Sequence, residues 1–174
     1  MAVKKKPKKA PKKKAPKKKA AARGSTTIDR LLRKAEALGV ATGIVMPIDE
    51  IQLGFKLSAQ PRRTAIPKLL VLAEHENMHA RRVALSALRR MEAWDDARVF
   101  DAFLRGRGDG EGWVRYDAAW ALGDSGTEDK RAIAGLTKLA RGALANPPLS
   151  DGDARAAAQA AESLATLRSG PKPG

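Results

Sequence analysis

The sequence predicts an all-α protein: an α-solenoid of about three helix pairs, with one or two N-terminal capping helices and a disordered basic tail. Three observations lead to this prediction. Alanine, which has the highest helix propensity, occupies 33 of the 174 positions. Apolar residues recur at helical spacing. The pattern Arg-x-x-Ala-x-x-Ala-Leu begins at Arg81 and again 34 residues later at Arg115, and a weaker copy follows near residue 157.

Residues 1–24, here called the arm, precede the predicted helices and consist mainly of Lys, Pro and Ala. The first 23 residues contain no acid and carry +12 of the net charge of +15, so only +3 remains for the rest of the chain. Three prolines prevent a continuous helix, and few apolar side chains are present, so we predict disorder. The cationic residues are Lys4, Lys5, Lys6, Lys8, Lys9, Lys12, Lys13, Lys14, Lys17, Lys18, Lys19 and Arg23.

The arm is predicted to bind nucleic acid, because each lysine that neutralises a phosphate releases condensed counterions. Lysine is a point charge and no aromatic residue is interleaved for stacking on bases, so the binding should ignore sequence and leaves DNA and RNA as alternatives. The composition resembles the tails of linker histones and of some bacterial histone-like proteins. The alternative is a segment that only targets or solubilises the protein, such as a nuclear import signal.

Residues 25–60 are expected to form capping helices that cover the apolar edge of the first repeat. Thr26–Asp29 has the form of a capping box and begins the first helix. Pro47 suits the first position of a second helix, and two acids follow in its first turn. Three apolar residues then share one face of this helix: Ile48, Ile51 and Phe55.

Residues 61–170 are predicted to form the repeats, and residues 171–174 a disordered C-terminus. One helix pair cannot bury its own apolar face, so about three stacked pairs are needed for a stable fold. The expected pairs are 65–74 with 80–91, 95–104 with 113–122, and 127–144 with 154–167.

Two segments, Trp113–Gly126 and residues 75–88, resemble the second helices of the short HEAT-like repeats that are named after phycobilisome lyases. The resemblance implies that an acidic residue in the turn pairs with the arginine of the following helix. Asp109 and Arg115 match this pattern and are expected to form a structural ion pair. His75 occupies the corresponding position before Arg81, so the resemblance does not imply a continuous series of such pairs.

The sequence HENMH at residues 75–79 is a literal H-E-x-x-H motif. In zinc peptidases this motif lies on one helix, so that both histidines bind the metal and the glutamate activates water. The repeat alignment instead places His75 in a turn, where residues i and i+4 do not share a face. We therefore expect no metal, no cofactor and no catalytic residue here, with a metallopeptidase as the less favoured alternative.

Trp113, Asp117 and Trp120 have the spacing i, i+4, i+7 and can share a helix face. One such Trp–Asp pair resembles the concave surface of HEAT-like DNA alkylation-repair glycosylases, which implies binding of a cationic damaged nucleotide. The chain is shorter than the six-repeat bodies of that family. The interpretation that we favour is structural: Trp120 lies in the core and Trp113 staples the helix start.

Four arginines, Arg62, Arg63, Arg82 and Arg89, are candidates for a secondary basic face that extends a polyanion path from the arm. The alternative is a solvated surface, because each unit also contains acids.

The composition excludes several classes of function. The chain has no cysteine, which excludes disulfides and thiolate chemistry, and its N-terminus lacks the apolar stretch of a signal peptide. We expect no membrane span and no secretion, and a location in the bacterial cytoplasm or nucleoid or in a eukaryotic nucleus. The predicted function is a non-enzymatic scaffold with a nucleic-acid-binding arm and a protein partner on its helices; the rival is a pure protein–protein adaptor.

Overall fold

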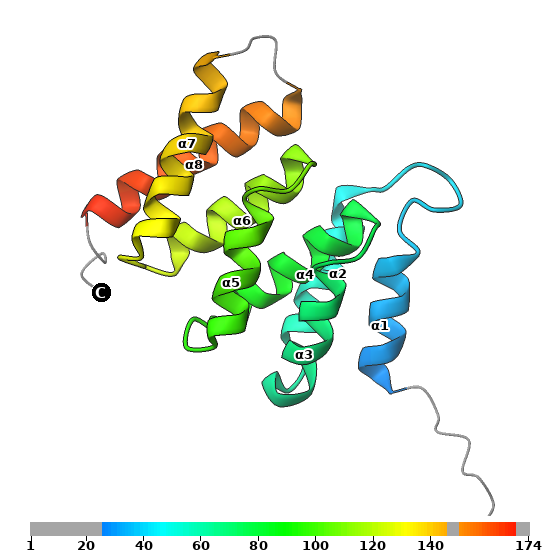
Figure 1. The fold of residues 1–174 in the computed structure, drawn as a ribbon. Coiled ribbons are helices and arrows are strands. Elements are labelled where there is room, and N and C mark those ends of the chain that lie inside the picture. The colour runs from blue at the N-terminus through cyan, green and yellow to red at the C-terminus, as the bar shows by residue number, and fades with distance from the viewer. Residues whose placement is uncertain (1–25, 146–149, 170–174) are drawn as a thin grey trace, which may run out of the picture.

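The computed structural model describes residues 26–145 and 150–169, and this part of the chain is all-α (Figure 1). The arm and residues 171–174 lie outside the described residues, so their predicted disorder stays a prediction. The described residues form eight helices and no strand: α1 (Thr27–Glu36), α2 (Pro47–Ser58), α3 (Arg62–Leu72), α4 (Met78–Arg90), α5 (Ala97–Gly106), α6 (Gly112–Asp124), α7 (Lys130–Ala145) and α8 (Asp151–Ser169).

The helices pack as consecutive pairs whose second members also contact one another. Each even-numbered helix packs against the helix that precedes it, and α2, α4, α6 and α8 pack in that order. The odd-numbered helices contact one another in a second row. Small residues of α4 and α6 allow the close approach, since Ala84, Ala87, Ala118 and Ala121 are fully buried. The predicted pairs are therefore present with boundaries that differ by a few residues.

The N-terminal helices begin as predicted but pack differently. The Thr26 side chain accepts a hydrogen bond from the Asp29 backbone, and the Asp29 carboxylate accepts one from the Thr26 backbone, which confirms the capping box. Pro47 is the first residue of α2. Helices α1 and α2 contact each other and α2 continues the row of second helices, so they form a further pair of the stack.

The apolar face of α2 that the sequence suggested is not buried. Ile48, Ile51 and Phe55 do share a face, but each is about half exposed, at 51%, 45% and 53%. The buried face of α2 contains Glu50 and the leucines at 53 and 57. Helix α2 therefore packs on α4 through this second face and presents the face with Ile48, Ile51 and Phe55 to solvent.

The most extensive contact between the described helices joins α6 to α8, and it depends on glycine. A Cβ added to Gly112 would lie 2.4 Å from the backbone carbon of Gly152, and one added to Gly123 would lie 2.5 Å from the Ser163 hydroxyl. Ser163 is buried and donates its hydroxyl to the Ala119 carbonyl over 2.9 Å. None of the described helices combines the length and apolar character needed to cross a bilayer.

Candidate functional site

Charged side chains connect α2, α4 and α6 on the face where the second helices meet. The Arg82 guanidinium on α4 donates to Glu50 Oε2 on α2 over 2.5 Å and to Asp117 Oδ2 on α6 over 2.8 Å. The second oxygen of Glu50 lies 2.6 Å from His79 Nδ1. One arginine therefore joins three consecutive second helices.

The carboxylates of this network are largely buried, and burial shifts the pKa of Asp117. The side chains of Glu50 and Asp117 are only 8% and 13% exposed. The pKa of Asp117 is raised to about 6, chiefly because the carboxyl is buried; the negative charge of Glu50 contributes to the rise, whereas the positive charge of Arg82 opposes it. At neutral pH the Asp117 carboxyl is therefore mostly ionised, with its pKa only about one unit below that pH.

Aromatic side chains form a row along α6 beside the network. The ring centroids of Trp113 and Tyr116 are 5.9 Å apart, and so are those of Tyr116 and Trp120. The Arg82 guanidinium carbon lies 5.2 Å from the Trp113 ring centroid, and that of Arg89 lies 3.8 Å from Trp120. Arg82 and Arg89 therefore each contact both a carboxylate and a tryptophan ring.

The structure overturns the expected role of Trp120. It is 36% exposed and stands at the rim of a hollow, so it is not a core residue. The core-facing positions of α6 are instead taken by small residues, by Val114 and by Leu122. Trp113 is half-buried in the first turn of α6, consistent with a packing role.

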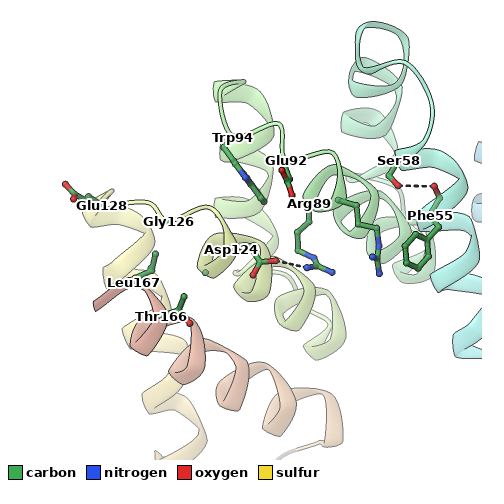
Figure 2. A pocket seen from close by; sticks show the side chains of 12 residues that line it. Phe55, Ser58, Arg89, Glu92, Trp94, Asp124, Gly126, Glu128, Thr166 and Leu167 are labelled. Carbon is green, nitrogen blue, oxygen red and sulfur yellow. Dashed lines mark hydrogen bonds and ion pairs between the residues drawn. The ribbon is translucent and has the colours of Figure 1, made fainter. Parts of the chain in front are cut away.

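A larger hollow of about 980 Å³ opens at the ends of α4 and α6 (Figure 2). Arg89 and Asp124 meet there, with 2.6 Å between Nη1 and Oδ2. On the α2 side the Arg90 guanidinium lies over the Phe55 ring at 3.8 Å. Glu92, Asp124 and Glu128 also line this hollow, so carboxylates outnumber the two arginines in its wall.

The predicted ion pair of Asp109 and Arg115 is wrong by one repeat. The Asp109 carboxylate accepts two hydrogen bonds, each 2.8 Å long, from Arg81 of the preceding unit. Arg115 instead contacts the Asp109 carbonyl and forms an ion pair with Asp153 of the following unit. Asp109 and Asp153 therefore each tie their own unit to the unit before it.

The HENMH motif is split between a turn and a helix. His75 precedes α4, and its Nδ1 accepts a hydrogen bond from the Asn77 backbone. Asn77 caps α4, and His79 in the first turn contacts Glu50. His75 therefore lies in a turn, as the repeat register predicted, and the two histidines have separate partners. Among the described residues no group of three or more His, Asp or Glu is placed to hold a metal ion.

The structure does not bring the four arginines of the proposed basic face together. Arg62 and Arg63 line a hollow with Asp95 and Asp96, whereas Arg82 and Arg89 line another beside α6. Arg62 forms an ion pair with Asp95 at 2.8 Å. Since Arg82 and Arg89 also bind carboxylates, Arg63 is the member of the four without an ion pair in the described part of the chain.

Sequence reasoning assigned three members of this surface to no site: Glu50, Tyr116 and Arg90, the last noted only as part of a basic doublet. Glu50 was interpreted only as an acid of a first helical turn, although it shares its spacing with Leu53 and Leu57, the buried positions of α2. Tyr116 lies between the two tryptophans in the sequence and joins their rings. The arm, the other predicted site, lies outside the described residues. No protein-family model, curated protein sequence or solved structure matches the chain.

Proposed function

We propose that this chain is a non-enzymatic binding module with two separate functions. The arm binds nucleic acid without sequence preference, and the helical body, a HEAT-like solenoid, holds a protein partner. The observation that carries the proposal is the division of charge. The first 23 residues have a net charge of +12, whereas the other 151 residues have a net charge of +3.

The ion pairs of the body support this division. Arg81, Arg82 and Arg89 on α4 and Arg115 on α6 each bind a carboxylate within the described residues. A cation that is already neutralised gains little from a phosphate, since no net counterion release follows. The arm contains twelve cations and no acid to neutralise them, which favours it as the contact for a polyanion.

The enzymatic alternatives have less support. A zinc peptidase needs both histidines of its motif on one helix, and His75 lies outside α4. A glycosylase needs an open carboxylate beside its tryptophans, and the Asp117 carboxylate binds Arg82. The adaptor alternative differs from the proposal only in the arm, so nucleic-acid binding by the arm decides between them.

The test measures binding of a fluorescent duplex of about 30 base pairs at low salt. Three full-length proteins are compared: the natural chain, a chain with all eleven arm lysines changed to Gln, and a chain with them changed to Arg. We expect the Gln chain to lose most of the affinity and the Arg chain to keep it, because charge rather than shape provides the binding. Equal affinity of the natural and Gln chains would overturn the proposal and leave the adaptor.

A further inference from the structure

One arginine of α4 differs from its three neighbours. Arg81 binds Asp109, Arg82 binds Glu50 and Asp117, and Arg89 binds Asp124. Arg90 has no carboxylate partner among the described residues, and its buried Nε has no hydrogen-bond partner there. Its contact is instead the face of the Phe55 ring.

This position is unfavourable for an unpaired charge. Burial lowers the pKa of Arg90, and the positive charge of Arg89 lowers it further. A partly buried guanidinium loses hydration, and a carboxylate with matching geometry compensates for that loss. The described chain supplies such a carboxylate to each of the other arginines of α4 but not to Arg90.

A hollow of about 250 Å³ lies between α2, α4 and α6, and Arg90 is part of its wall. The wall contains three arginines and two carboxylates. Both carboxylates, Glu50 and Asp117, already accept hydrogen bonds from Arg82. The remaining positive charge is therefore that of Arg90. Ile51 and Trp120 also line this hollow, and the Phe55 ring lies against Arg90; all three side chains are exposed.

We propose that these four residues, Ile51, Phe55, Arg90 and Trp120, form a docking band for a protein segment that presents a carboxylate next to an apolar side chain. The carboxylate pairs with Arg90, and the apolar side chain packs between the exposed rings and Ile51. The inference deepens the protein-binding half of the proposed function by naming the surface and the chemistry of the partner.

Charge complementarity selects this occupant over the others. The arm carries the same sign of charge as Arg90 and contains no acid. A nucleic-acid strand would bring several phosphates close to Glu92, Asp124 and Glu128, which line the adjoining hollow together with Arg90. A segment with one carboxylate directed at Arg90 and with apolar anchors brings a single negative charge there instead of several, and so meets less repulsion.

The probe is a random peptide library of about 12 residues per member, the scale of a segment that spans a few helices. It is selected on the full-length chain with arm lysines changed to Gln, which removes non-specific attraction of acidic peptides to the arm. We expect enriched peptides to share an acid beside apolar residues. Their affinity should fall about tenfold or more in Arg90→Gln and in Phe55→Ala, and be unaffected in Arg63→Gln, an exposed arginine of α3.

A twin of each enriched peptide, meaning the same peptide with its Asp or Glu changed to Asn or Gln, tests directly whether the peptide carboxylate pairs with Arg90. The twin should lose as much affinity as Arg90→Gln causes, and the two changes together should cost no more than either alone. Lack of such enrichment, or equal binding by Arg90→Gln, overturns the proposal. So does binding of single-stranded oligothymidine that is lost in Phe55→Ala, or a dimer in sedimentation that Phe55→Ala separates. Because the arm is neutralised throughout, failure here is distinct from failure of nucleic-acid binding by the arm.

Discussion

Arg82 is the charged residue whose loss the fold should tolerate least. Changing it to Ala leaves Glu50 and Asp117 buried without a counterion, so we expect a loss of about 3–5 kcal/mol in the free energy of unfolding. Urea denaturation followed by circular dichroism measures this loss.

The matched control is Arg62→Ala, which removes an ion pair whose side chains are 49% and 82% exposed. Exposed pairs contribute about 1 kcal/mol or less. Similar losses in the two variants would mean that the network between α2, α4 and α6 does not stabilise the fold.

Asp117 should make stability depend on pH in a defined direction. Its folded-state pKa of about 6 lies above the ordinary value of 3.8, so between these values the folded protein binds a proton that the unfolded chain releases. The stabilising contribution is therefore complete below about pH 4 and is lost as the pH rises through about 6.

We expect the natural protein to lose roughly 2–3 kcal/mol relative to Asp117→Asn between about pH 4 and pH 7. Denaturation of both proteins at each pH measures the difference. A difference that is constant with pH, or that grows in favour of the natural protein at high pH, would show that Arg82 dominates over burial.

Helices α4 and α6 end in the same way 34 residues apart, but with different residues. Glu92 has φ 51° and Gly126 has φ 63°, so both occupy the left-handed position that follows a helix. That conformation costs about 1 kcal/mol for a residue with a Cβ. We expect Glu92→Gly to stabilise the protein by about 0.5 kcal/mol and Gly126→Ala to destabilise it by about 1 kcal/mol. Thermal unfolding measures both; equal signs would contradict the repeat in backbone geometry.

The contact between α6 and α8 should be sensitive to a single methyl group. In Gly112→Ala the new Cβ meets the backbone of Gly152, which cannot move aside as a side chain can, so the helices must separate. We expect a loss of about 1–3 kcal/mol in the free energy of unfolding. Gly110→Ala is the control, because nothing lies within 4 Å of its added Cβ. Equal stability of the two variants would contradict the close approach of these helices.

At the scale of single helices, the sequence predicted the positions of the helices correctly wherever the signal came from residues close together in the chain. The capping box at Thr26, the proline at position 47 and the repeated Arg-x-x-Ala-x-x-Ala-Leu pattern placed the helices, since caps and small-residue spacing act within one element. Helix α2 was harder because it has two apolar faces. Contact with α4 decides which of them is buried, and no pattern within α2 contains that information.

At the scale of the whole molecule, the sequence did not predict which residues of neighbouring units pair with one another. Asp109 and Arg115 are close in the chain, yet the Asp109 carboxylate binds Arg81 because consecutive second helices lie side by side. The exposure of Trp120 has a similar origin, because α6 packs on α8 through the small residues of α6. The docking band could be found only from such contacts between units in the structure, whereas the charge of the arm follows directly from the sequence.

The central claim is that the arm, and not the helical surface, binds nucleic acid. The most direct test is the salt dependence of duplex binding by the full-length natural chain. For Z neutralised phosphates the slope of log K against log salt is about −0.9Z, and we expect Z of roughly 6–10 from the twelve cations of the arm. Affinity should therefore collapse between about 50 and 200 mM salt and be nearly absent when the arm lysines are Gln. A shallow slope with tight binding that survives the Gln changes would contradict the account and assign binding to the helices.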